Sequence, residues 1–263
     1  MKLIADNLRI TQKAIESAVR EKDFIPLQTL VKQCETAGAD GIDINSGPLY
    51  HDPEARMIFM VEAVQQVTRL PLILDTSNPK ALKAGLLASK NAATINGVSL
   101  EPSKLEHILP LASAHQADII CYLLYPNGHI PPDSAERLNM AISLFQKCLN
   151  AGIEPDCIII DPVIVPLSWQ DGLVQAREVL TVIKTLPELL GFPVRTIAGL
   201  SNLTAGAGDP DKKQLAAQTY LSMLASAGLS MVLMNVLNPE TMRTSRTCRM
   251  FSHETIFTWE MIG

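Results

Sequence analysis

Polar side chains that could bind a ligand close several apolar runs of this sequence. Residues 157–162 read CIIIDP, in which Asp161 ends the run. Asp75 in LILDTSN, Asn96 in ATINGVS and Asn202 in IAGLSN hold similar places. A buried polar group costs free energy unless a hydrogen bond pairs it. Carboxylates accept hydrogen bonds and amides both donate and accept, so such a set fits a neutral heterocycle that is rich in N–H groups.

Residues of the same kind recur at the other apolar runs. The further candidates are Asp6, Asn7, Asp43, Asn45, Ser201 and Asn235. Any one of them could be a helix cap or a solvated loop residue, but their recurrence at one run after another favours a shared site. His, Cys and Glu are missing from these ends, and no serine–histidine–aspartate arrangement is present. We therefore expect no transition-metal site.

The elements that must position these residues alternate in type along the chain. Near-continuous runs of Ile, Leu, Val, Ala and Met predict buried parallel strands at 3–8, 41–45, 71–76, 93–98, 118–124, 157–162, 194–200 and 231–236. Amphipathic segments between the runs predict helices. This alternation in 263 residues predicts an α/β protein, a (β/α)8 TIM barrel, with residues 1–263 as its single domain. A doubly wound open sheet is the alternative, although eight units would be many for it.

In a barrel of this kind the carboxyl ends of all strands lie at one face, where active sites are built. The polar strand ends are therefore expected to converge on one cavity. Loop 202–213, which reads NLTAGAGDPDKK, follows the seventh predicted strand and would border that cavity. Its two glycines suit a loop that closes over a ligand or receives a partner protein. Lys212 and Lys213 could meet an anionic tail or a phosphate.

Composition and charge argue against several classes of protein. Hydrophobic residues make up 47% of the chain and charged residues 19%, which is enough apolar material for a large core. The net charge of −5 and the lack of basic runs argue against nucleic-acid binding. No apolar stretch approaches the about 18 residues of a membrane span. The five cysteines form no CxxC pair, so we expect reduced side chains in a cytoplasmic protein without zinc.

Five motifs, in order and with matching spacing, resemble a known family. They are AGADGIDINSGP, LILDTSNPKALKAGL, ATINGVS, IIIDPVIVPLS and IAGLSN. They are similar to the pterin-binding methyltransferases that move a methyl group between tetrahydrofolate and a corrinoid protein, and the likeness extends over essentially the whole chain. It implies a pterin-binding (β/α)8 barrel, usually a homodimer, without a metal of its own. Tetrahydrofolate or 5-methyltetrahydrofolate would be one substrate, and cobalamin on a partner corrinoid protein would be the other.

The resemblance also implies roles for individual residues. Asp75, Asn96 and Asp161 match the positions that hydrogen-bond the pterin ring, with Asp161 at the amino-pyrimidine edge. Asn202 matches the catalytic asparagine near N5, the nitrogen that carries the methyl group. The residues expected to support the site or to let the ring approach the backbone are Asp6, Asp43, Asn45, Gly199, Ser201 and Asn235.

Two departures from related patterns bear on the expected function. The family's first strand commonly ends in Gly-Glu-Arg-x-Asn, whereas this chain reads ADNLRIT, so Asp6 stands for the glutamate and Arg9 occupies the asparagine position. Dihydropteroate synthases share the barrel but carry Ser-Arg-Lys after the seventh strand and Arg-x-His on the eighth. This chain reads LSNLTAG and VLMNVLN there, which argues against that synthase activity.

These patterns predict a methyltransferase, and the first-strand change favours one direction of transfer. Activation of N5 as a leaving group is essential when 5-methyltetrahydrofolate gives the methyl group, but not when tetrahydrofolate accepts it. We therefore predict transfer from a methyl-corrinoid to tetrahydrofolate, which yields 5-methyltetrahydrofolate. Two other functions remain open from the sequence: a non-catalytic pterin-binding protein, and a TIM-barrel enzyme that acts on a phosphate-bearing ligand.

Overall fold

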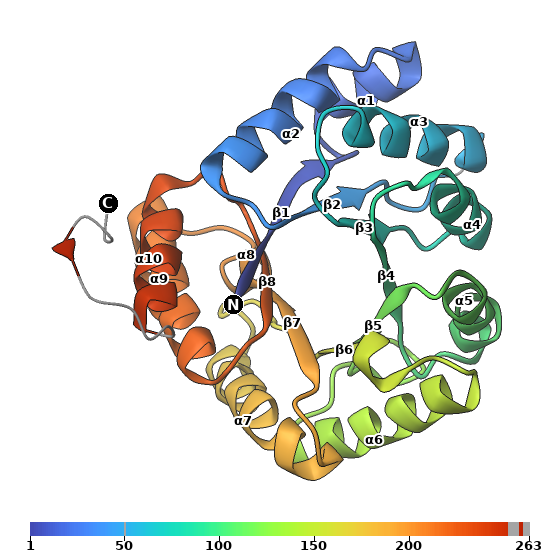
Figure 1. The fold of residues 1–263 in the computed structure, drawn as a ribbon. Helices are drawn as coiled ribbons and strands as arrows, with labels where there is room; N and C mark the ends of the chain where they lie inside the picture. Colours follow the sequence, from blue (N-terminus) through green and yellow to red (C-terminus); the bar gives the residue numbers. More distant parts are fainter. Residues whose placement is uncertain (50, 252–257, 260–263) are drawn as a thin grey trace.

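The computed structural model describes residues 1–49, 51–251 and 258–259, in which eight parallel strands form a closed barrel (Figure 1). The strands are β1 (Lys2–Arg9), β2 (Gly41–Asn45), β3 (Leu72–Asp75), β4 (Ala93–Val98), β5 (Asp118–Tyr122), β6 (Ile158–Asp161), β7 (Arg195–Gly199) and β8 (Met231–Met234). Each strand pairs with its neighbours in sequence, and β1 also pairs with β8. This last pairing closes the barrel.

Helices surround the barrel and cover its outer face (Figure 1). They are α1 (Lys13–Glu21), α2 (Ile25–Ala37), α3 (Pro53–Gln65), α4 (Pro79–Ala88), α5 (Pro102–His115), α6 (Ser134–Asn150), α7 (Gly172–Leu190), α8 (Leu200–Leu203), α9 (Pro210–Ser226) and α10 (Pro239–Phe251). A short 3-10 helix at Pro155–Cys157 precedes β6. Among the described residues, no helix has the length and apolar character to cross a membrane.

The TIM barrel predicted from the sequence is confirmed, and the open sheet is excluded because the first and last strands pair. The observed strands lie within a few residues of the predicted ones. The largest differences are in β5 and β8, which end at Tyr122 and Met234, two residues before their predicted ends at 124 and 236. After Gly199 the chain turns directly into α8, so Asn202 lies in a helical turn that follows the strand.

Side chains inside the barrel form an apolar layer with a more polar layer above it. Successive residues of a strand point to opposite faces, so residues two apart share a face. The apolar layer consists of Ile4, Ile73, Ile120, Ile159, Ile197 and Met231. Two residues further along the same strands lie Asp6, Asp75, Tyr122, Asp161, Gly199 and Leu233. The strand ends therefore present polar groups at the barrel mouth, above a buried apolar plug.

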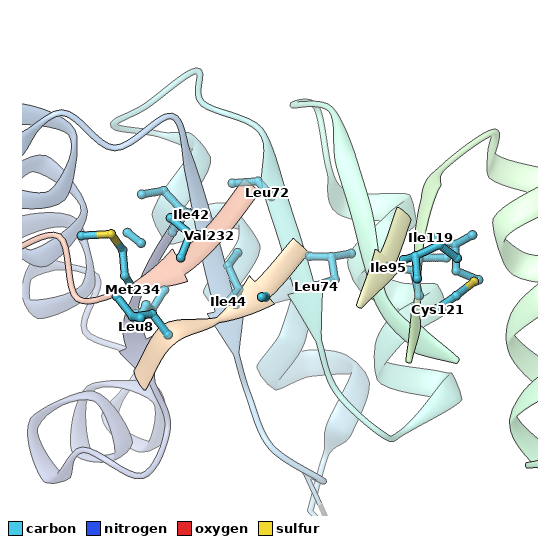
Figure 2. Close-up of a cluster of buried hydrophobic side chains, with 14 of the residues drawn as sticks. Leu8, Ile42, Ile44, Leu72, Leu74, Ile95, Ile119, Cys121, Val232 and Met234 are labelled. Atoms are coloured by element: carbon cyan, nitrogen blue, oxygen red, sulfur yellow. The ribbon is translucent and has the colours of Figure 1, made fainter. Parts of the chain in front are cut away.

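The opposite face of the strands packs against the helices. Side chains on this face belong to the main buried cluster, and those labelled in Figure 2 are Leu8, Ile42, Ile44, Leu72, Leu74, Ile95, Ile119, Cys121, Val232 and Met234. Burial of one such aliphatic side chain contributes about 1.5–3 kcal/mol to folding. Because the outer face is packed in this way, the alternating residues of the inner face are held in fixed positions.

Candidate functional site

A cavity of about 360 Å³ opens at the carboxyl ends of the strands, a size within the usual range of small-molecule sites. Its lining consists of Asp6, Arg9, Thr11, Asp43, Asn45, Asp75, Asn96, Tyr122, Asp161, Gly199, Ser201, Asn202 and Leu233. The structure thus brings together all the site residues predicted from the sequence except Asn7 and Asn235. A larger cavity, of about 680 Å³, lies between α9 and α10, and no carboxylate lines it in the part of the chain that the structure describes.

Three neighbouring strands place an amide, a carboxylate and an amide side by side. Asn45 of β2 is in register with Asp75 of β3, which is in register with Asn96 of β4. Nδ2 of Asn45 donates to Oδ2 of Asp75 at 2.5 Å and so fixes the orientation of that carboxylate. A Cβ at Gly97 would lie 2.3 Å from the carbonyl oxygen of Ile120, so only glycine fits beside Asn96.

Tyr122 lines the cavity, although it was not among the site residues predicted from the sequence. Its hydroxyl donates to Oδ1 of Asn96, which leaves Nδ2 of that amide to face a ligand. Burial, and then the charges of the surrounding aspartates, raises the pKa of the Tyr122 phenol. The hydroxyl therefore stays protonated and acts as a donor. Its position two residues after Ile120, which fills the barrel interior, is the signal that could have identified it.

Asp6, Asp43 and Asp75 bring three carboxyl groups to one side of the cavity. Burial, followed by the charges of Asp75 and Asp6, raises the pKa of Asp43 well above its ordinary range, although Arg9 opposes this effect. Burial raises the pKa of Asp75 to about 6, again against the charge of Arg9. Oδ1 of Asp6 and Oδ1 of Asp43 are buried without a hydrogen-bond partner among the described residues. Polar atoms in this condition are suited to pair with a bound ligand.

Arg9 contributes the positive charge that faces these carboxyl groups. Its guanidinium forms an ion pair with Asp6, and its Nε donates to the carbonyl oxygen of Asp6 at 2.7 Å. Nη2 also lies 3.2 Å from Oγ of Ser201, to which it donates. Oγ of Ser201 in turn donates to Oδ2 of Asp6 at 2.6 Å. Arg9, which stands where the family's first strand commonly has asparagine, therefore connects β1 to the helical turn that carries Asn202.

Asp161 closes the cavity on the opposite side of the barrel from these groups. Its Oδ1 accepts a hydrogen bond from the backbone N–H of Val163 at 2.8 Å. Val163 has a φ of 64°, in the left-handed region that β-branched residues rarely adopt. Burial raises the pKa of Asp161 to about 7, whereas the Val163 N–H and the charge of Arg137 lower it. A strained backbone and a buried carboxyl group in one place are typical of a functional site.

Replacement of Asp161 by asparagine is expected to stabilise the ligand-free protein at alkaline pH. The pKa of about 7 in the folded protein lies above the ordinary value of 3.8, so the folded state keeps a proton that the unfolded chain has lost. The protonated Asp161 carboxyl group contributes fully to the free energy of unfolding below about pH 4, the ordinary pKa. This contribution is lost as the pH rises from there through about 7. Relative to the wild type, Asp161→Asn should raise the free energy of unfolding by about 4 kcal/mol near pH 8.5 but by only about 1.5 kcal/mol near pH 5.

Urea unfolding of both proteins at the two pH values measures this difference. Asp52→Asn removes an exposed carboxylate from the loop after β2 and should change neither value by more than about 0.5 kcal/mol. If Asp161→Asn destabilised the protein equally at both pH values, the assignment of a buried, proton-holding carboxyl group would be wrong.

Asn202 lies at the mouth of the cavity, next to the backbone of β7. A Cβ at Gly199 would lie 3.1 Å from Nδ2 of Asn202, so the amide rests directly against that glycine. The side chain is exposed, and no hydrogen bond to its amide is seen within the described part of the chain. It is therefore available to a ligand that fills the cavity below it.

Asn235 does not reach the cavity, in contrast to the expectation from the sequence. Strand β8 ends at Met234, and the chain turns there. Oδ1 of Asn235 accepts from the backbone N–H of Leu237 at 3.0 Å and from Nδ2 of Asn7 at 2.6 Å. Oδ1 of Asn7 accepts from the N–H of Val236 at 3.1 Å. These two amides fasten the end of β8 to β1 beside the site.

Metal or phosphate binding has less support than binding of a heterocycle. No group of three or more His, Cys, Asp or Glu side chains in the described ranges is placed to hold a metal ion. The N-terminus of α9, where a barrel could bind phosphate, is already occupied by its own cap. Oδ1 of Asp209 accepts from the N–H groups of Asp211 and Lys212 at 3.0 and 3.1 Å. Nζ of Lys213 donates to the carbonyl oxygen of Gly206.

Comparison with known proteins gives a family match and two informative relatives. A family model described as pterin binding enzyme matches residues 16–235. Methylcorrinoid:tetrahydrofolate methyltransferase of Eubacterium limosum is 24% identical over 245 residues, which cover 92% of this chain and 88% of that protein. Methionine synthase of Mycobacterium tuberculosis is 22% identical over 235 residues, which cover 85% of this chain but only 19% of the synthase.

Similar solved structures include dihydropteroate synthases. The enzyme of Stenotrophomonas maltophilia with active-site-bound imidazole has a TM-score of 0.71 and 17% identity, with 97% of this chain and 94% of that chain covered. The enzyme of Xanthomonas albilineans in complex with 7,8-dihydropteroate has a TM-score of 0.67 and 18% identity, with 95% and 93% covered. At this level of identity the likeness concerns the fold.

Proposed function

The chain belongs to the pterin binding enzymes, and on this premise we propose that it transfers a methyl group between a corrinoid and N5 of tetrahydrofolate. One observation carries the proposal: a single cavity at the strand ends gathers the carboxylates and amides that a pterin ring needs, with Asn202 at its mouth. The similarity to methylcorrinoid:tetrahydrofolate methyltransferase over most of both chains supports the same reaction.

In this proposal the pterin ring lies in the cavity above the apolar plug. Asp161 accepts hydrogen bonds from the ring N–H and the amino group of the pyrimidine. Asn96, oriented by Tyr122, and Asp75, oriented by Asn45, bond the remaining polar atoms of the ring. The glycine at 199 lets the ring approach the backbone. N5 then lies at the side of the cavity where Asn202 is exposed.

Methyl displacement of this kind needs no protein nucleophile. N5 of tetrahydrofolate attacks the methyl carbon, the carbon–cobalt bond breaks, and the corrinoid substrate leaves as Co(I) with both electrons of that bond. N5 then loses its proton and 5-methyltetrahydrofolate results. The amide of Asn202 can hydrogen-bond N5 while its charge changes, and such a contact accelerates the reaction when it is strongest in the transition state. The barrel contributes orientation, because it holds one of two large substrates in line for attack.

The favoured direction is transfer from a methyl-corrinoid to tetrahydrofolate. Arg9 occupies the first-strand position where the family commonly has asparagine. Replacement of that asparagine is more tolerable when N5 of tetrahydrofolate accepts the methyl group, because N5 then needs no activation as a leaving group. The sequence contains no DxHxxG-like cobalamin motif, so a separate corrinoid protein would deliver the methyl group. We also propose that the protein forms a homodimer and acts in the cytoplasm.

Anaerobic assays in both directions test this function. Purified protein with methylcobalamin and tetrahydrofolate should give 5-methyltetrahydrofolate together with the absorbance change of Co(I). If Co(I) and 5-methyltetrahydrofolate reacted readily while the forward mixture gave no product, the direction would be wrong. Binding of tetrahydrofolate without turnover in either direction, also with a methylated corrinoid protein, would favour a non-catalytic pterin-binding protein.

Gly199→Ala is expected to slow methyl transfer by about three- to ten-fold. The added Cβ would lie 3.1 Å from Nδ2 of Asn202, so the amide must move by a few tenths of an ångström. Small displacements of a group that acts on the reacting atom reduce the rate. Single-turnover kinetics at saturating tetrahydrofolate measure the effect on the rate, and calorimetry measures the loss of affinity that follows where the added methyl group meets the ring. Weakened binding with an unchanged rate would instead mean that Gly199 serves only the approach of the ring.

A further inference from the structure

We propose that Arg137 is a positioning residue for Asp161, whose buried positive charge behind the end of β6 keeps the Asp161 carboxylate negative when a pterin binds. This inference rests on the proposed pterin-binding function and assigns a role to a residue outside the cavity. Arg137 does not line the site, and none of the steps above uses it.

Arg137 lies in the first turn of α6 and is completely buried. Helix α6 follows β5 and packs against both β6 and α7 (Figure 1). A helix that follows a barrel strand begins at the carboxyl ends of the strands, so the first turn of α6 lies at the level of the end of β6, which carries Asp161. Nη2 of Arg137 donates to Oε1 of Gln175 on α7. Nε2 of Gln175 donates in turn to the carbonyl oxygen of Pro132 at 3.0 Å and to Oδ2 of Asp171 at 2.9 Å. The guanidinium is therefore held in one place by a neutral amide.

No carboxylate in the described ranges forms a salt bridge with this guanidinium. Its Nε and Nη1 are buried and have no hydrogen-bond partner among the residues that the structure describes. The ionisable groups that interact with its charge are Glu178, Tyr220, Asp161 and Asp171. Glu178 accepts from the backbone N–H of Ser134 at 2.6 Å, and Tyr220 donates to the carbonyl oxygen of Ala176 at 2.7 Å. The charge of Arg137 thus acts on its surroundings at a distance rather than through one ion pair.

A buried arginine without a direct ion pair is unfavourable compared with an apolar side chain of similar volume. Packing between α6 and α7 does not require a charge, since an unbranched apolar side chain could fill the same space. The nearby Asp161 carboxyl group offers a reason for a positive charge at this buried position. Burial of that group raises its pKa to about 7, and Arg137 is one of the two influences that lower it. Without the guanidinium, Asp161 would hold its proton through the neutral pH range.

The ionisation state of Asp161 decides whether it can recognise a pterin. An ionised carboxylate accepts two hydrogen bonds, one from the ring N–H and one from the amino group of the pyrimidine. A protonated carboxyl group would direct its own O–H against one of these donors. The affinity for tetrahydrofolate should therefore rise with pH as Asp161 loses its proton, and Arg137 should set the pH at which this occurs.

Calorimetric titration with tetrahydrofolate, without oxygen, from about pH 6 to about pH 9 tests the proposal. The wild type and Arg137→Lys, which keeps the charge, should show similar midpoints. Arg137→Met should shift the midpoint upward by about one pH unit or more, so that affinity near pH 7 falls by about tenfold while affinity near pH 9 approaches that of the wild type. Arg137→Gln, which is neutral but keeps a polar end group, should behave like Arg137→Met.

Several outcomes would overturn the inference. One is an unchanged midpoint in the neutral variants, and another is a loss of affinity that is equal at every pH, as expected for a merely structural residue. Failure of both neutral variants to fold, while Arg137→Lys folds, would likewise make Arg137 a structural residue. Wild-type protein that binds no tetrahydrofolate at any pH would contradict the proposed function itself, so the two failures can be told apart.

Discussion

Asn202→Ala is expected to lower the rate constant of methyl transfer by about ten- to a thousand-fold, with a smaller effect on the affinity for tetrahydrofolate. The amide of Asn202 is exposed at the cavity mouth against Gly199, on the side where N5 would lie. N5 changes its charge as the carbon–nitrogen bond forms. A hydrogen bond that is strongest at that moment stabilises the transition state more than the bound substrate, so its loss appears mainly in the rate.

Single-turnover kinetics with saturating tetrahydrofolate and methylcobalamin would measure the rate constant, and calorimetry the affinity. Asn127→Ala is a matched control, because it truncates an exposed asparagine of the loop after β5 that does not line the cavity. This control should retain the wild-type rate. Equal losses in affinity and rate for Asn202→Ala would make Asn202 a plain binding residue.

Asp161→Ala is expected to weaken tetrahydrofolate binding by about 2–4 kcal/mol, or about 30- to 700-fold in the dissociation constant. Two N–H donors of the pyrimidine edge would be left buried and unpaired. The N–H of Val163, which donates to Oδ1 of Asp161 at 2.8 Å, would also lose its acceptor. Loss of a charged hydrogen-bond acceptor with its partners left in place accounts for an effect of this size.

Calorimetry near pH 8, where the wild-type carboxylate is largely ionised, gives this comparison. Asp52→Ala removes an exposed carboxyl group from the loop after β2 and should bind tetrahydrofolate as the wild type does. An affinity of Asp161→Ala equal to that of the wild type would remove Asp161 from the proposed site.

The barrel could be predicted from the sequence because parallel strands covered on both faces consist of nearly continuous apolar residues. The runs that contain Ile73, Ile159 and Ile197 supply both the interior plug and, on alternate residues, the contacts with the helices. A polar residue inside or at the end of such a run stands out, which is why Asp75 and Asp161 could be identified as candidates.

Other features of the cavity depend on contacts between distant segments and left weaker signals. Tyr122 follows three apolar residues of β5, Ile119–Cys121, and so resembles a core residue, and its bond to Asn96 could not be anticipated. Asn235 lies two residues beyond Leu233 and by alternation should face the cavity, but the strand ends first and the side chain bonds the turn instead. The sequence marked Arg9 as a departure, yet only the fold brings it to Ser201, far along the chain.

Arg137 left no signal in the sequence. It occurs in SAERLNM, at the start of an amphipathic helix, where an arginine ordinarily faces solvent. Its burial results from the packing of α6 against α7 and β6, which depends on contacts that no local pattern encodes.

The structure of the protein with tetrahydrofolate bound, determined without oxygen, tests the central claim most directly. The account predicts that the pterin ring fills the strand-end cavity, with its amino group and ring N–H on the Asp161 carboxylate and with N5 within hydrogen-bond distance of the Asn202 amide, about 3 Å. A pterin ring bound outside this cavity, or one turned so that N5 lies away from Asn202, would contradict it.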